Sequence, residues 1–88
     1  MIRTYSDPLI AVEVESHLLS NGIRHTTVTA ESDTATGKPK EFKVNFYGQI
    51  AEDALKSIVR GCKFTYRGHL SIEDGQAILV AKAFATIV

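Results

Sequence analysis

The chain has 88 residues, of which 44% are hydrophobic and 23% charged, and its ten basic and ten acidic side chains cancel. This length fits one domain, residues 1–88, and the composition is that of a folded protein. The balanced charge excludes a protein that coats nucleic acid or membrane by bulk charge, while a local basic patch stays open. The single cysteine, Cys62, and a start without a signal-peptide pattern indicate a cytoplasmic protein, which we expect to be bacterial or from a phage.

The N-terminal part of the chain predicts a short strand and then a helix. The run Ile2–Tyr5 is β-prone, and Asp7 and Pro8 are typical of a helix start, because Asp caps a helix and Pro suits its first position. Apolar residues at helical spacing continue to about Asn21, where Gly22 ends the pattern. These apolar residues are Ile10, Ala11, Val14 and Leu18, with Val12 and Leu19 as a second, narrower line.

The middle of the chain predicts a hairpin and a second helix. Arg24–Ala30 is rich in Thr and Val, and Glu41–Tyr47 alternates apolar and polar residues as a half-buried strand does. Glu31–Lys40 between them holds no large apolar residue, which predicts a long loop. Gln49–Arg60, closed by Gly61, is apolar on one half of the helical wheel and predicts a helix.

The C-terminal part predicts a strand over Lys63–Leu70 and an ambiguous tail over residues 76–88. Ser71 as a cap and four alanines favour a helix for the tail. Against this, Glu73-Asp74-Gly75 is a good hairpin turn, and the apolar residues after it alternate as in a strand. We favour the helix.

These elements run in the order β-α-β-β-α-β, which predicts a ferredoxin-like, or split βαβ, α+β domain with an extra C-terminal helix or strand. In that fold the helices cover one face of a four-stranded sheet, and the other face is open unless the tail or a partner covers it. The segment from Tyr5 to Ile23 resembles the start of small bacterial β-α-β signal-transducing domains. Only strand, helix and cap carry this resemblance, so it implies no functional residue.

No constellation of residues predicts catalysis, a cofactor or a metal. Gly37-Lys38 lacks the earlier glycine and the following Ser or Thr of a phosphate-binding loop. The four possible metal ligands, His17, His25, Cys62 and His69, lack the short spacings of metal sites, and nothing pairs Cys62 with a base. No stretch is long and apolar enough to span a bilayer. We therefore expect no enzyme, no cofactor, no metal and no membrane contact.

The first functional hypothesis rests on a surplus of apolar residues. The line Val12 and Leu19, the tail with Phe84 and the uncovered sheet face exceed what one small core needs. This surplus favours a non-catalytic protein-binding module, a regulator or an inhibitor, that acts as a homodimer through its tail. In a monomer the tail would instead cover the open sheet face.

The alternative hypothesis is a single-stranded nucleic-acid-binding domain that uses the open sheet face. Basic and aromatic side chains interleave on the expected strands, as they do on RNA-recognition domains. On the expected strands these residues are Arg3, Tyr5, Lys43, Tyr47, Lys63, Phe64, Tyr66 and Arg67, and Arg60 stands at the end of the expected helix before Lys63. The strand Glu41–Tyr47 lacks the glycine of the RNA-recognition signature, which ranks this function second. The candidate partner-binding residues of the two hypotheses are Val12, Leu19, Lys43, Tyr47, Tyr66, Arg67 and Phe84.

Overall fold

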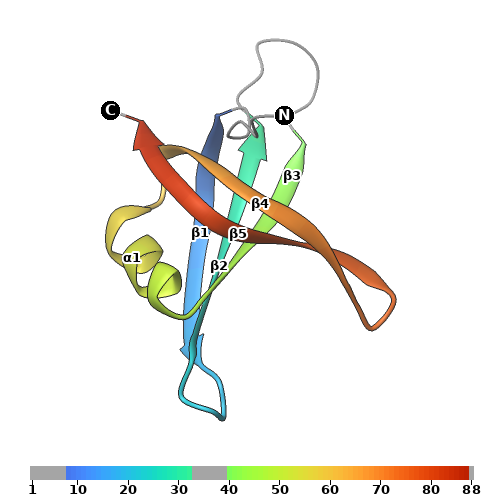
Figure 1. Cartoon of the computed structure of the whole chain (residues 1–88). Helices are drawn as coiled ribbons and strands as arrows, with labels where there is room; N and C mark the ends of the chain where they lie inside the picture. The colour runs from blue at the N-terminus through green and yellow to red at the C-terminus, as the bar shows by residue number, and fades with distance from the viewer. Residues whose placement is uncertain (1–7, 33–39, 88) are drawn as a thin grey trace.

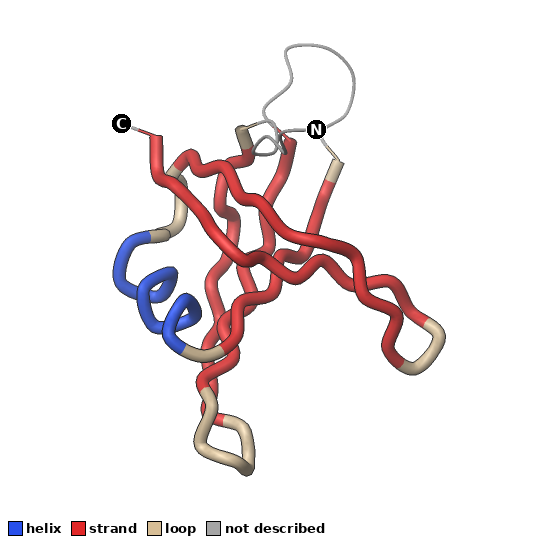
Figure 2. Tube along the Cα trace, viewed as in Figure 1, coloured by secondary structure: helices blue, strands red, loops and turns tan. Residues whose placement is uncertain are grey.

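The computed structural model describes residues 8–32 and 40–87, which form a β-barrel of five strands and one helix (Figures 1 and 2). The elements are β1 (Leu9–Leu18), β2 (Arg24–Ser32), β3 (Glu41–Tyr47), α1 (Gln49–Ser57), β4 (Lys63–Glu73) and β5 (Gln76–Ile87). The strand order around the barrel is β1-β2-β3-β5-β4, and the pairing of β1 with β4 closes it. Neighbouring strands are antiparallel except β3 and β5, which share a short parallel contact.

The expected ferredoxin-like order β-α-β-β-α-β is wrong, because the described chain runs β-β-β-α-β-β. Two segments for which helices were expected are the strands β1 and β5. Since the strands close on one another, the open sheet face on which both functional hypotheses relied does not exist. The expected strand Ile2–Tyr5 and the pair Gly37-Lys38 lie outside the described residues.

β1 occupies the segment that helical spacing assigned to a helix. Its side chains alternate between exposed and half-buried from Glu13 onward, with Glu13 and Glu15 exposed and Val14 half-buried. A β-bulge between Ala11 and Glu13 leaves Val12 without a cross-strand partner and reverses the alternation. The inward residues Ala11 and Val14 are therefore three apart, so a bulged strand imitates the periodicity of a helix.

β5 occupies the tail for which a helix was favoured, so that preference is wrong and the strand alternative is right. Asp74 and Gly75 both have positive φ, 51° and 77°, in a tight turn whose twist matches that of the flanking strands. Farther along, Ala81 is buried opposite Gly68, where an added Cβ would lie 1.9 Å from the Val80 oxygen. Small residues thus let β5 cross close to β4, and this packing outweighs the helix propensity of alanine.

The other expected elements are confirmed with small changes at their ends. β3 has the expected bounds, β2 continues to Ser32 and β4 continues to Glu73. The helix α1 ends at Ser57 instead of Arg60, because Ile58 leaves the helical conformation and buries its side chain. No helix among the described residues is long and apolar enough to cross a membrane.

The hydrophobic core fills the barrel and continues onto α1. Its largest fully buried side chains include Phe46 from β3 and Phe64 from β4, and burial of each contributes about 1.5–3 kcal/mol. The buried Thr26 of β2 donates a hydrogen bond from Oγ1 to the Ala51 oxygen of α1 at 2.8 Å. The helix is thereby held against the barrel by packing and by a buried polar contact. The outer face of β2 and β3 points away from α1, so the helix does not cover it.

Candidate functional site

The β4–β5 hairpin projects from the barrel (Figure 1). An open groove of about 740 Å³ lies between this hairpin and the outer face of β2 and β3. We call residues 66–82 of this hairpin the arm. The groove exists because β5 pairs with β3 only at two positions, opposite Val44 and Asn45, and otherwise diverges from it. Its lining residues are Glu15, Thr27, Thr29, Glu41, Phe42, Lys43, Asn45, Tyr66, Leu70, Ile78 and Leu79.

The floor of the groove is polar and is held by hydrogen bonds. Thr27 Oγ1 donates to Asn45 Oδ1 at 3.1 Å, and Asn45 Nδ2 donates to the main-chain oxygen of Leu79 at 3.1 Å. His25 Nε2 lies 2.8 Å from the same Asn45 Oδ1. Although Asn45 points away from the core, these contacts leave it only 8% exposed. Asn45 therefore fixes the arm to the floor at the place where β5 leaves β3.

Three rings lie side by side next to this floor, one from each of β1, β2 and β3. His17, His25 and Tyr47 are cross-strand neighbours, so the pleat places them on one face. The Tyr47 ring stacks on the His25 ring with centroids 4.5 Å apart and planes 7° apart. The His17 ring meets the His25 ring edge-on at 5.0 Å. We call these three residues the ring row; they form an ordered set of contacting rings across three strands.

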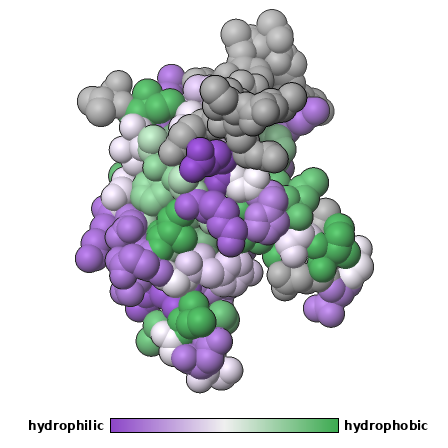
Figure 3. Space-filling view, in the orientation of Figure 1, coloured by the Kyte–Doolittle hydropathy of each residue, from purple (hydrophilic) through white to green (hydrophobic). Residues whose placement is uncertain are grey.

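The arm forms an apolar wall opposite the polar floor. Tyr66, Leu70, Ile78 and Leu79 line it, and Leu70 is 64% exposed. Figure 3 shows hydrophobic surface on the arm, set apart from the more polar barrel body. Burial raises the pKa of the Tyr66 hydroxyl above its ordinary value. A ligand with flat apolar faces and polar edges fits between such a wall and such a floor.

The structure brings some of the candidate partner-binding residues to this site. Lys43 lies on the floor and Tyr66 on the wall, with Tyr47 next to them in the ring row. Arg67 follows Tyr66 but lines a hollow on the opposite face of the arm. Three of the seven candidates therefore converge on one surface, and a fourth lies behind it.

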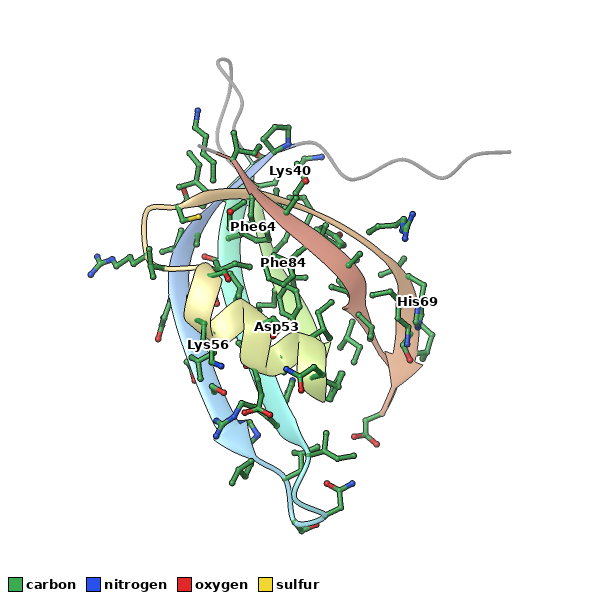
Figure 4. The ribbon with its side chains drawn as sticks, turned by 60° about the vertical axis from the view of Figure 1, so that its left-hand side comes forward. Lys40, Asp53, Lys56, Phe64, His69 and Phe84 are labelled. Carbon is green, nitrogen blue, oxygen red and sulfur yellow. The ribbon has the colours of Figure 1, made fainter. Side chains whose placement is uncertain are left out.

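The remaining candidates lie elsewhere. Phe84 is half-buried, and its ring meets the Phe46 ring edge-on at 5.6 Å, so it belongs to the core (Figure 4). Val12 lies at the bulge of β1, beside the end of α1, and Leu19 lies in the turn between β1 and β2. These apolar residues do not form one surface with the groove.

The possible metal ligands are not brought together. His17 and His25 are ring neighbours, whereas Cys62 precedes β4 and His69 lies on the arm (Figure 4). Within residues 8–32 and 40–87, no three His, Cys, Asp or Glu side chains are placed to hold a metal ion.

Sequence reasoning missed Thr27, Thr29 and Asn45 on the floor and Leu70 and Leu79 on the wall. The signal for the floor was present, because Thr and Asn alternate with buried residues along β2 and β3. For the wall there was no such signal, because it depends on β5 being a strand.

The barrel resembles solved structures whose sequences differ widely from this one. The SSB domain of a Synechococcus sp. protein superposes with a TM-score of 0.74, at 13% identity, over 94% of this chain and 98% of that chain. The barrel is an OB-fold. The protein priB from Ralstonia solanacearum gives a TM-score of 0.68 at 14% identity, over 91% of this chain and 92% of that chain. A small single-stranded DNA-binding protein from Streptomyces coelicolor gives 0.66 at 20% identity, over 100% and 96%.

Comparisons of the sequence with known families and with curated proteins do not add to these structural matches. No family model matches the chain, and no curated protein matches it significantly. The main functional hypothesis, a protein-binding regulatory or inhibitory module, is nevertheless wrong. It depended on an apolar helical tail, which is the strand β5, and the Synechococcus and Streptomyces structures are named for SSB and for single-stranded DNA binding. These names match the alternative hypothesis, single-stranded nucleic-acid binding, better than they match a protein-binding module.

Proposed function

We propose that this chain binds single-stranded nucleic acid in the groove between β2–β3 and the arm, without catalysis. The observation that carries the proposal is the position of the groove. OB-folds bind oligonucleotides and oligosaccharides on the face of their second and third strands and with the loops beside it. The groove of this chain lies on that face, bordered by the β4–β5 hairpin. The names of the Synechococcus and Streptomyces structures support the same function.

The chemistry of the groove suits bases better than it suits a protein surface. A base has an apolar face, which can pack on Tyr66 or on the ring row, and polar edges, which can meet Thr29 and other floor residues. Stacking of a base on an aromatic side chain contributes about 1–3 kcal/mol and tolerates any sequence. Nucleic acid is therefore the favoured partner, in place of the expected protein.

Lys43 offers the first test, because it is the only basic side chain among the described residues that line the groove. The logarithm of the binding constant falls linearly with the logarithm of the salt concentration, and each phosphate contact to a single strand adds about 0.7 to the size of this slope. One such contact corresponds to roughly 8-fold in affinity at about 50 mM salt. We expect Lys43→Ala to weaken binding of a fluorescent single strand of about 20 nucleotides by that factor, measured by anisotropy. The length exceeds the site of one OB-fold, about 4–16 nucleotides.

The matched control is Lys56→Ala, which removes an exposed lysine from α1 on another side of the molecule (Figure 4). It should leave the affinity unchanged. The wild type should also bind the single strand more tightly than a duplex of the same sequence, since only unpaired bases can enter the groove. Equal affinity for both forms, or equal effects of the two lysine variants, would count against the proposal.

The expected homodimer stays a proposal, on a different basis. The apolar helix that was to pair two chains does not exist, and Phe84 packs on Phe46 within one chain. Support comes instead from large apolar side chains at the ends of the β1–β2 and β4–β5 hairpins. Between 43% and 71% of the surface of each of these side chains is exposed. These are Leu18, Ile23, Leu70 and Ile72. We expect light scattering at micromolar concentration to give a dimer; a monomer at every concentration tested would contradict this.

A further inference from the structure

The groove is lined by more carboxylates than cationic groups. Glu15 of β1 and Glu41 of β3 line it, together with one ammonium group, that of Lys43. Both glutamate side chains are exposed, and neither has a hydrogen-bond or ion-pair partner among residues 8–32 and 40–87. A carboxylate can only accept hydrogen bonds. The groove therefore offers a ligand two charged acceptors that the described part of the chain does not use.

The strand pairing fixes where these two carboxylates lie. Glu15 is the cross-strand partner of Thr27, and Thr27 is the partner of Asn45, so the three share one row of the floor. Glu41 begins β3 and lies two residues before Lys43, and side chains two apart in a strand share a face. One carboxylate thus stands at the β1 side of the floor and the other at the start of β3.

The neutral donors of the floor are partly used within the protein. The Thr27 hydroxyl donates its proton to Asn45 Oδ1, and Asn45 Nδ2 donates to the Leu79 oxygen. Lys43 is the group that we assign to a phosphate contact. A threonine hydroxyl, such as that of Thr29, both donates and accepts. The groups left for the edge of a base are therefore mainly acceptors.

The bases differ in what they can offer to such acceptors. Cytosine, adenine and guanine carry an amino group, whereas thymine carries a carbonyl oxygen where cytosine carries its amino group, and uracil does the same. A hydrogen bond from an amino group to a carboxylate is charge-assisted and stronger than a neutral one. A carbonyl oxygen that faces a carboxylate is repelled instead. Phosphates are also repelled, so a strand turns its bases toward the carboxylates.

We propose that Glu15 and Glu41 are specificity-determining residues, which make the groove select bases that carry an amino group over thymine and uracil. This inference rests on the proposed function of the groove and deepens it, because it names the class of strand that binds best. Stacking on aromatic rings tolerates every base, so the selection comes from the edges of the bases. The preferred strand is rich in cytosine, adenine or guanine.

The test compares two homopolymers of about 20 nucleotides, oligodeoxycytidine and oligodeoxyuridine, a length that exceeds the site of one OB-fold. Both are pyrimidine strands without a methyl group on the base, so they differ in the hydrogen-bonding edge alone. A good contact between a side chain and a base edge discriminates by about 5-fold to 150-fold. We expect the wild type to bind the deoxycytidine strand at least about 5-fold more tightly, measured by anisotropy at mildly alkaline pH, where cytosine carries no extra proton.

The double variant Glu15→Gln with Glu41→Gln identifies the residues responsible. Glutamine keeps the length of the side chain, donates as well as accepts, and carries no charge that repels phosphates. The variant should bind the deoxyuridine strand more tightly than the wild type does, and should bind both strands with nearly equal affinity. Because both positions are exposed, circular dichroism should show the variant folded. The matched control, Asp53→Asn on α1 (Figure 4), should change neither the affinities nor the preference.

The outcomes separate this inference from the proposed function. If the wild type binds neither strand, the proposed function fails and the selection fails with it. If the wild type binds both strands equally, or the double variant keeps the preference, only the selection by Glu15 and Glu41 is wrong. A double variant that loses affinity for both strands by the same factor would also overturn it, since a structural role has that signature. An equal gain in the Asp53→Asn control would assign the effect to net charge instead.

Discussion

Replacing Gly68 with alanine is expected to lower the free energy of unfolding by about 3 kcal/mol, at the upper end of what overpacking costs. The added Cβ would lie 1.9 Å from the Val80 oxygen and 2.8 Å from the Ala81 Cα. Both are main-chain atoms, so no side chain can rotate away and β5 itself must move. A domain of this size is stabilised by only about 0.05–0.15 kcal/mol per residue, so the loss is a large part of its stability.

Urea denaturation measures this effect, with Gly75→Ala as the matched control. Gly75 lies in the turn of the same hairpin at φ 77°, and a Cβ there meets nothing within 4 Å. Alanine at that position should therefore cost only about 1–2 kcal/mol, the strain of a left-handed conformation. A Gly68→Ala protein that is no less stable than Gly75→Ala would show that β4 and β5 do not cross as closely as described.

The same pair of variants connects the arm with the groove. The hydrogen bond from Asn45 to the Leu79 oxygen of β5 holds the wall of the groove to its floor. If β5 is displaced opposite Gly68, this bond is disturbed and the wall moves away from the floor. Gly68→Ala should therefore also weaken single-strand binding under conditions where the variant is still folded, whereas Gly75→Ala should not. Unchanged binding by a folded Gly68→Ala protein would separate the arm from the site.

The strands with unbroken alternation could be predicted from sequence. In β3, Val44 and Phe46 are buried as the pattern predicts, and the bounds of the strand agree with the structure. The helix α1 was equally predictable, since its apolar half-wheel is packed against the barrel. In both elements the local pattern and the tertiary environment favour the same conformation.

The elements that were not predicted contain the irregularities that close the barrel. The bulge at Val12 gives β1 a helical spacing of apolar residues, and the register shift next to Gly68 lies in the hairpin whose second strand was taken for a helix. Bulges bend strands and increase their twist, which a small barrel requires. The same features that make this fold possible therefore hide its strands from periodicity.

The site was predicted only in part for the same reason. Lys43, Tyr47 and Tyr66 were recognised as basic and aromatic residues on strands, which their sequence shows directly. Tyr66 faces β3 across the groove only because β4 is part of the arm. The arm exists only because β5 is a strand that pairs with β4. Composition can thus indicate the chemistry of this site, but the surface that assembles it is a property of the closed barrel.

The largest expected effect on binding comes from removal of the two tyrosine rings, Tyr47 and Tyr66. Tyr47 is stacked on His25 beside the floor, and Tyr66 lies on the wall. Each stacked base contributes about 1–3 kcal/mol, so the double variant Tyr47→Ala with Tyr66→Ala should bind a single strand about 30-fold to about 20,000-fold more weakly. Anisotropy with the strand of about 20 nucleotides measures the loss, at a temperature where circular dichroism shows the variant folded.

Replacing the same two residues with phenylalanine distinguishes stacking from hydrogen bonding. Phenylalanine keeps the ring face of Tyr47 and Tyr66 and removes only the hydroxyl groups, so stacking predicts affinity within a few-fold of the wild type. The stacking energy of the rings does not depend on salt, whereas the phosphate contact of Lys43 does. The alanine variant should therefore keep the salt slope of the wild type while its affinity falls at every salt concentration. A loss confined to low salt, or an equal loss in the phenylalanine variant, would mean that the rings are not the surface on which the bases stack.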